Sequence, residues 1–151
     1  MTARRIVATG TFDILHPGHL FYLEESRKLG DELVVIVARD TNVKHKPRPV
    51  IPEEHRLRMV AALKPVDRAL LGDKSDMFRP IEELRPDIIT IGFNQMFDET
   101  KLAGQLRDRN LTPEIIRIGK CADGDLCSSR LVVQRIIDRR SHDRHHPADQ
   151  Y

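Results

Sequence analysis

Five short apolar runs alternate with helix-patterned segments along most of this chain, and that alternation constrains the fold more than any other feature. Apolar runs of this length are typical of strands buried on both faces. The predicted strands span Arg5–Thr9, Glu32–Ala38, Arg68–Leu71, Asp87–Ile91 and Glu114–Ile118. The predicted helices span Leu20–Leu29, Pro52–Leu63, Met77–Leu84, Glu99–Arg109 and Ser128–Arg139. Strands separated by helices pair in parallel, so we expect an α/β domain with a five-stranded parallel sheet and helices on both faces.

Length and composition predict one domain. The chain has 151 residues, of which 40% are apolar, and a chain of this size can bury roughly two-thirds of its unfolded surface in a single core. The segment Ser141–Pro147 is polar and has no periodicity. We therefore expect a domain over residues 1–140 and a disordered tail over residues 141–151.

Charge and hydropathy argue against two classes of partner. No run approaches the roughly 18 apolar residues of a membrane span, and the N-terminus lacks the apolar core of a signal peptide, so we expect a cytoplasmic protein. The net charge is only +2, and no Lys/Arg stripe is interleaved with aromatic residues. The sequence therefore predicts neither a membrane nor a nucleic-acid partner.

The turn between the first predicted strand and helix carries the most specific pattern. It runs Gly10-Thr11-Phe12-Asp13-Ile14-Leu15-His16-Pro17-Gly18-His19. A helix start offers N–H groups and the positive end of a dipole to an anion, and His16 and His19 are spaced to face one ligand. Gly18 would let a phosphate chain approach the backbone, and Pro17 suits a first helical position. We therefore expect this turn to bind the phosphates of a nucleotide. The alternative, which applies to any pair of histidines at this spacing, is that the two side chains only form local hydrogen bonds.

The string G-T-F-D-x-x-H-x-G-H resembles the signature of the nucleotidylyltransferase superfamily, which includes cytidylyltransferases. The resemblance implies a Rossmann-like fold in which His16 and His19 are catalytic and bind the nucleotide phosphates. It also implies ATP contacts from the neighbouring motif residues, namely Thr11, Phe12, Pro17 and Gly18.

A basic loop follows the second predicted strand, from Arg39 to Arg48. Charge runs of this kind are usually solvated surface. In the cytidylyltransferases that this chain resembles, lysines of this loop and an arginine of the next segment approach the triphosphate. By that resemblance Lys44 and Arg56 are predicted catalytic residues, and further candidates are His45, Lys46 and Arg48.

Two later segments are predicted to contact the nucleotide. Asn94 stands where the family commonly has aspartate, and its amide can bind ribose or base; capping the segment from Phe97 to Arg109 is the alternative. Ser128 or Ser129 is expected to cap the last helix. Both serines and Arg130 would then offer donors to the β- and γ-phosphates.

The overall sequence resembles the archaeal FAD synthases, which transfer AMP from ATP to FMN. The resemblance extends to Gly30–Leu33, Val35–Asp40 and Ala62–Asp67. One alternative is a cytidylyltransferase that uses CTP and a small phosphorylated alcohol such as glycerol 3-phosphate. Glycerol-3-phosphate cytidylyltransferases carry an R-T-x-G-I-S-T-T element that helps to bind CTP. The corresponding stretch of this chain, residues 122–129, lacks the arginine of that element. A second alternative is a regulatory module that binds nucleotide without catalysis.

The implied reaction needs no general base, because a phosphate monoester is already anionic at neutral pH. A divalent cation, Mg²⁺ or another ion, would bridge phosphate oxygens, and we assign no residue as its ligand. A homodimer is compatible with these expectations. Phe12, Phe93 and Phe97 are candidate flavin-stacking residues, although core packing is the favoured role for each.

Cys121 and Cys127 are the only cysteines, and their spacing matches neither a C-x-x-C motif nor a structural zinc site. Packed thiols are therefore the default. Because they flank a loop of the predicted site, we hypothesise that their oxidation lowers activity.

Overall fold

The computed structural model describes residues 2–44, 47–122 and 126–142. Within these ranges the chain forms a five-stranded sheet of order β3-β2-β1-β4-β5, and each neighbouring pair is parallel. The strands are β1 (Arg5–Gly10), β2 (Glu32–Val37), β3 (Arg68–Leu71), β4 (Ile88–Ile91) and β5 (Glu114–Arg117). The predicted α/β fold with a parallel sheet is confirmed.

Helices connect the strands as the sequence predicts, with ends that differ by a few residues. They are α1 (Pro17–Arg27), α2 (Glu53–Ala61), α3 (Arg79–Leu84), α4 (Glu99–Arg107) and α5 (Ser129–His142), with a short 3₁₀ turn η1 (Asp40–Asn42) after β2. Helix α5 includes the first two residues of the predicted tail, and residues 143–151 of that tail lie outside the described residues.

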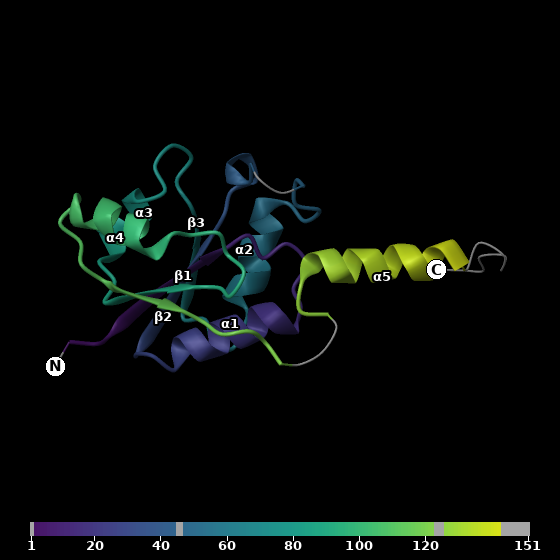
Figure 1. Ribbon diagram of the computed structural model, residues 1–151, viewed down its shortest axis with the longest axis horizontal. Helices are drawn as coiled ribbons and strands as arrows, with labels where there is room; N and C mark the ends of the chain where they lie inside the picture. Colours follow the sequence, from purple (N-terminus) through teal and green to yellow (C-terminus); the bar gives the residue numbers. More distant parts are fainter. Residues whose placement is uncertain (1, 45–46, 123–125, 143–151) are drawn as a thin grey trace.

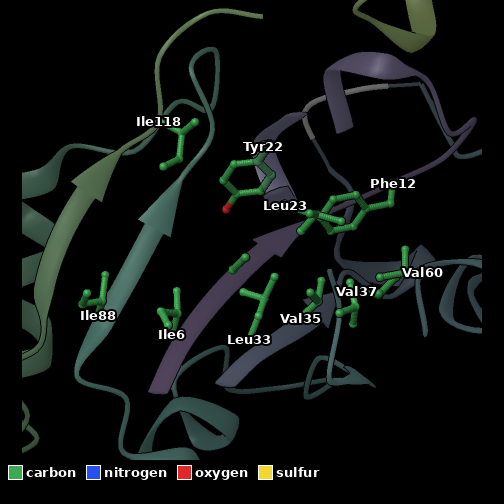
Figure 2. Close-up of a cluster of buried hydrophobic side chains, with 12 residues drawn as sticks. Ile6, Phe12, Tyr22, Leu23, Leu33, Val35, Val37, Val60, Ile88 and Ile118 are labelled. Atoms are coloured by element: carbon green, nitrogen blue, oxygen red, sulfur yellow. The ribbon is translucent and has the colours of Figure 1, made fainter. Parts of the chain in front are cut away.

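Helices cover both faces of the sheet, and alternating strand residues feed two cores (Figure 1). On β1, Ile6 and Ala8 join the core beneath α1 and α2, whereas Val7 joins the core beneath α3 and α4. Figure 2 shows the first core, in which Leu23 of α1 and Val60 of α2 pack over the strands. These buried residues hold the sheet that supports the loops at its carboxyl edge.

The strand order reverses between β1 and β4. Strand β1 pairs with β2 over six residue pairs but with β4 over only three, from Ile6–Ile88 to Ala8–Thr90. The two central strands therefore stop pairing before they end. Ligands of open parallel sheets bind outside the carboxyl ends of the strands at such a reversal, which is where the opening turn follows β1.

Helix α5 differs from the other helices in its surroundings. None of its residues is buried, and Figure 1 shows it projecting away from the sheet. Among the described residues, no helix has both the length and the apolar character needed to cross a bilayer.

Candidate functional site

The two histidines of the opening turn stack on each other. Pro17 is the first residue of α1, as predicted, and His16 is its N-cap with extended backbone angles. The His16 Nδ1 atom accepts a hydrogen bond from the His19 backbone N–H at 3.3 Å. The ring centroids lie 3.7 Å apart with planes 24° apart. The local hydrogen bond that a bare histidine pair predicts is thus present, and it holds both rings side by side.

This cap fixes the protonation state of His16. A ring nitrogen that accepts a hydrogen bond carries no proton, so the neutral ring keeps its proton on Nε2. Partial burial acts in the same direction, because desolvation lowers the pKa of His16. His16 is therefore a neutral N–H donor at neutral pH.

Phe12 anchors the opening turn to the core. Its backbone is left-handed, with φ of 53°, and the residue as a whole is 3% exposed. The ring packs against Tyr22 and lies 5.2 Å, between centroids, from His19. An aromatic residue in this conformation is strained by about 1–3 kcal/mol, which the buried ring offsets. The Phe12 side chain is thus in the core, and its backbone is the part that lies in the turn.

Gly18 is required by the protein's own packing. A Cβ atom here would lie 2.7 Å from the Cys127 carbonyl oxygen and 2.9 Å from the His16 ring. The glycine therefore lets the segment before α5 approach the first turn of α1. Close approach of a phosphate, which the sequence predicts, is compatible with this geometry.

Arg56 is held beneath the turn. The residue is 1% exposed, and its guanidinium donates to the Thr11 carbonyl at 2.6 Å, the Ile51 carbonyl at 2.9 Å and the Asp40 carboxylate at 2.7 Å. These bonds occupy its Nε, Nη1 and Nη2 atoms. The structure thus brings Arg56 to the opening turn through contacts with the protein; its direct contact with a ligand stays a prediction.

Asp13 makes a second tie from the same turn. Its two carboxylate oxygens accept the backbone N–H groups of Val50, at 2.9 Å, and Ile51, at 2.8 Å. The carboxylate therefore joins the opening turn to the segment that leads into α2. Asp13 lies inside the recognised motif, yet the sequence does not reveal this partner, which is 37 residues away.

The basic loop follows β2 at the same sheet edge. Lys44 and Arg48 are exposed. Their exposure is compatible both with a solvated surface loop and with side chains that bind an anion. The candidates His45 and Lys46 lie outside the described residues.

The loop after β4 places Asn94 at the surface. The alternative that Asn94 caps the following helix is wrong, because Asp98 is the N-cap of α4 and accepts the Lys101 N–H at 3.1 Å. A side chain four residues before the cap lies too early to reach the first helical N–H groups. Asn94 is thereby left to face solvent at the edge where β4 ends.

Two residues that the sequence analysis missed fix this loop. Gln95 accepts the Gly92 N–H at 2.7 Å and donates to the Thr9 carbonyl at 2.9 Å, which ties β4's loop to β1. Arg117, on β5, donates to the carbonyls of Gly92, Gln95 and Phe97. Neither residue belongs to a motif, so the sequence carries no signal for them.

The start of α5 closes the opening turn. Ser128 accepts the Leu131 N–H at 3.2 Å, which confirms the predicted serine cap. Ser129 donates to the Ile14 carbonyl at 3.3 Å and so brings the C-terminal segment to the opening turn. Arg130 is exposed beside them.

The two cysteines lie next to this junction. Their Sγ atoms are 3.1 Å apart, and both residues are thiols rather than half-cystines. The structure thus brings together two thiols that the sequence spacing alone did not pair.

The three phenylalanines that are candidates for stacking on the flavin divide between core and surface. Phe12 is buried and Phe97 packs against the second core, as favoured from the sequence. Phe93 contradicts that expectation, because it is 56% exposed on the loop after β4. The turn at this position directs its ring outward.

No group of three or more His, Cys, Asp or Glu side chains that could hold a metal occurs among the described residues. Mg²⁺ in phosphoryl-transfer sites keeps several waters and binds substrate phosphates together with one or two protein carboxylates.

Known proteins share both the sequence and the fold. Residues 7–135 match the family model described as cytidylyltransferase-like. The FAD synthase of Methanoregula boonei is 71% identical over 93% of this chain and 95% of its own length. That of Methanosphaerula palustris is 72% identical over 91% of this chain and 90% of its own.

A solved structure agrees with the fold. The crystal structure of a Thermoplasma volcanium protein, titled as a lipopolysaccharide core biosynthesis protein, superposes with a TM-score of 0.77 at 48% identity. The superposition covers 80% of this chain and 99% of the Thermoplasma volcanium chain. The stacked histidines at the carboxyl edge of a parallel sheet therefore lie in a chain that belongs to the cytidylyltransferase-like family and, within it, to the archaeal FAD synthases.

Proposed function

We propose that this chain transfers AMP from ATP to the phosphate of FMN and so forms FAD and pyrophosphate. One observation carries the proposal: two stacked imidazoles stand at the start of α1, beside the strand-order reversal, in a chain more than 70% identical to proteins named FAD synthase. The enzyme is thus a nucleotidyltransferase.

The reaction is a single displacement. An oxygen of the FMN phosphate attacks the α-phosphorus of ATP, and the bond from that phosphorus to the bridging oxygen of the β-phosphate breaks. Pyrophosphate leaves with the electron pair of that bond. The attacking oxygen is already anionic, so catalysis reduces to positioning and to stabilising charge on the phosphates.

We assign the site residues to four tasks. His16, through its Nε2–H, and His19 donate to the phosphates where negative charge builds. Lys44 supplies a mobile positive charge from the basic loop, and Asn94 binds ribose or base. The remaining ATP contacts come from the opening turn and the start of α5, through Thr11, Phe12, Pro17, Gly18, Ser128, Ser129 and Arg130.

Arg56 has a different proposed task. Its guanidinium grips the Thr11 carbonyl, so it holds the turn in the conformation that presents both histidines. In this role Arg56 is a positioning residue, and its effect on ATP is indirect.

A divalent cation, Mg²⁺ or another ion, would neutralise the triphosphate and would bind mainly to its oxygens. We place the reaction in the cytoplasm, with ATP and FMN as the substrates and with neither a membrane nor a nucleic acid as partner. The cytidylyltransferase alternative loses support, because both near relatives carry the name FAD synthase.

The proposal is tested by incubating the purified protein with FMN, Mg²⁺ and either ATP or CTP. Flavins are separated by chromatography, and pyrophosphate is measured in the same samples. We expect FAD and an equal amount of pyrophosphate with ATP. Pyrophosphate release with CTP and glycerol 3-phosphate, without flavin turnover, would instead support the cytidylyltransferase, and nucleotide binding without any product would support a regulatory module.

A further inference from the structure

The loop after β4 presents two apolar side chains to solvent. Phe93 is 56% exposed and Met96 is fully exposed. Phe93 and Asn94 are the two central residues of a tight turn, which the Gln95 N–H closes on the Gly92 carbonyl at 3.2 Å. Such central positions are dominated by Gly, Pro, Asn, Asp and Ser. A phenylalanine at the tip of this turn gains nothing from the core of its own chain.

Two other side chains hold this turn in one conformation. Gln95 accepts the Gly92 N–H at 2.7 Å and donates to the Thr9 carbonyl at 2.9 Å. The Arg117 guanidinium donates to three carbonyls of the loop over distances between 2.8 and 3.0 Å. The exposed ring of Phe93 therefore stands on a braced backbone, and a ligand that packs on it does not have to order the loop first.

The turn lies beside the opening turn. The Gln95 side chain bonds to the Thr9 carbonyl, and Gly10 and Thr11 follow directly along the chain. In the strand order β3-β2-β1-β4-β5, β2 and β4 lie on opposite sides of β1. The basic loop after β2 and the loop after β4 therefore flank the opening turn on opposite sides.

The direction of attack decides which substrate comes to the β4 side. In phosphoryl transfer, the attacking and leaving oxygens are roughly in line through the phosphorus atom. The proposed function directs the leaving pyrophosphate towards Lys44, on the β2 side of the opening turn. The phosphate of FMN then approaches from the β4 side, where Phe93 is exposed.

The chemistry of the exposed side chains suits a flavin. The isoalloxazine of FMN is a planar system of three fused rings with a wide face, and such faces stack on aromatic side chains in an offset arrangement. The polarisable thioether of Met96 also packs favourably on aromatic rings. A ring and a thioether side by side thus offer a surface for one large planar ligand.

We propose that Phe93 stacks on the isoalloxazine ring of FMN and, together with Met96, forms the flavin-binding surface of this enzyme. The inference rests on the proposed function, because it takes FMN as the acceptor of AMP. Phe93 binds the ring of FMN in this assignment, while the histidine pair binds the phosphates of ATP.

Steady-state kinetics of Phe93→Ala tests the stacking. We expect the KM for FMN to rise about tenfold, and kcat and the KM for ATP to stay within about twofold, because stacking of a planar ring on an aromatic side chain contributes on this order. Phe93→Tyr keeps an aromatic ring and should keep the wild-type KM. Met59→Ala is the matched control, because Met59 on α2 is also 56% exposed and lies outside the proposed surface.

Three kinetic results would overturn the assignment. A rise in the KM for ATP alone would show that Phe93 stacks on adenine. Unchanged constants in Phe93→Ala would show that no substrate contacts the ring. The third concerns Leu20, which lines an apolar groove along α1 together with His16: weaker FMN binding in Leu20→Ser, with none in Phe93→Ala, would move the flavin to that groove.

Fluorescence tests the contact directly, because the chain contains no tryptophan. An indole stacked on a flavin quenches the flavin emission by electron transfer at contact distance. Phe93→Trp is titrated into FMN with Mg²⁺ and an ATP analogue that has a methylene bridge between its α- and β-phosphates. We expect the flavin emission to fall well below that seen with wild type, and Met59→Trp to match wild type. Equal emission with both tryptophan variants would contradict the contact.

The two proposals fail in different ways. If wild type forms no FAD from ATP and FMN, the proposed function falls. If wild type and Phe93→Ala both form FAD with the same KM for FMN, the proposed function stands and the flavin-binding surface falls.

Discussion

The Tyr22 hydroxyl of α1 donates a hydrogen bond to the Thr90 backbone carbonyl near the end of β4, over 2.8 Å. The same oxygen accepts the Thr9 N–H at 3.3 Å. Figure 2 shows this hydroxyl pointing from the helix towards the strands. It reaches the place where β1 and β4 have stopped pairing, and burial raises the pKa of Tyr22 to about 12. The Tyr22 hydroxyl thus forms hydrogen bonds with the Thr9 N–H and the Thr90 carbonyl at the point where β1 and β4 separate.

Tyr22→Phe keeps the buried ring but removes this hydroxyl. Because the Thr90 carbonyl and the Thr9 N–H lose a partner in a buried place, we expect the free energy of unfolding to fall by about 1–3 kcal/mol. Urea denaturation of wild type and variant measures the difference. Equal midpoints and slopes would show that water replaces the phenol without cost.

His19→Ala removes one of the two proposed phosphate donors. We expect FAD formation to fall on the order of 100-fold or more, because a preorganised donor to developing charge is lost. Circular dichroism should stay unchanged, since His19 is only partly buried. Turnover at the wild-type rate would remove the histidine pair from the mechanism.

Protonation of His16 should destabilise the fold in acid. Its pKa lies below the ordinary 6.5, so the unfolded chain binds the proton more readily than the folded protein. This contribution is fully present above about pH 6.5 and is lost as the pH falls towards the lowered pKa. Wild type should therefore lose more stability than His16→Asn between about pH 7.5 and about pH 5.5, because asparagine can cap α1 but does not titrate. Parallel losses in the two proteins would contradict the assignment.

Arg56→Lys separates positioning from ligand contact. Lysine keeps the charge but cannot donate along three directions to Thr11, Ile51 and Asp40 at once. We expect the free energy of unfolding to fall by about 1–3 kcal/mol. We also expect kcat to fall more than the KM for ATP rises, because the histidines lose their alignment. A large rise in KM with unchanged stability would instead place Arg56 on the triphosphate.

Oxidation of the cysteine pair should lower activity. With Sγ atoms 3.1 Å apart, Cys121 and Cys127 can be joined by a mild oxidant, which would shift the Cys127 carbonyl that packs against Gly18. We expect diamide to inhibit wild type and dithiothreitol to restore it. The Cys121→Ser/Cys127→Ser enzyme should resist the same treatment, and equal inhibition of this variant would sink the idea.

Periodicity predicted the sheet and its helices because buried strands and packed helix faces leave strong patterns. Periodicity was a less reliable guide to burial on α5, whose apolar residues are not buried, and on α2, where a charged residue is buried. On α2 the charged side chain of Arg56 is buried. Its burial depends on two carbonyls and a carboxylate from other segments, which no local pattern reveals.

The opening turn was predictable for a different reason. Strand, turn and helix are contiguous there, so His16, Pro17 and Gly18 could be placed from local rules alone. The residues that support the turn come from distant segments: Gln95 reaches the Thr9 carbonyl across 86 positions. Such contacts exist only once the sheet has formed, and a single sequence does not show them.

The bonds from Asp13 to Val50 and Ile51, and from Arg56 back to Thr11 and Ile51, make one mechanical unit of two loops that are far apart in the sequence. Substitutions in the two loops should therefore be epistatic, with combined effects that differ from the sum of the single ones. Grafting the motif turn into another scaffold would require residues 50 to 56 to travel with it.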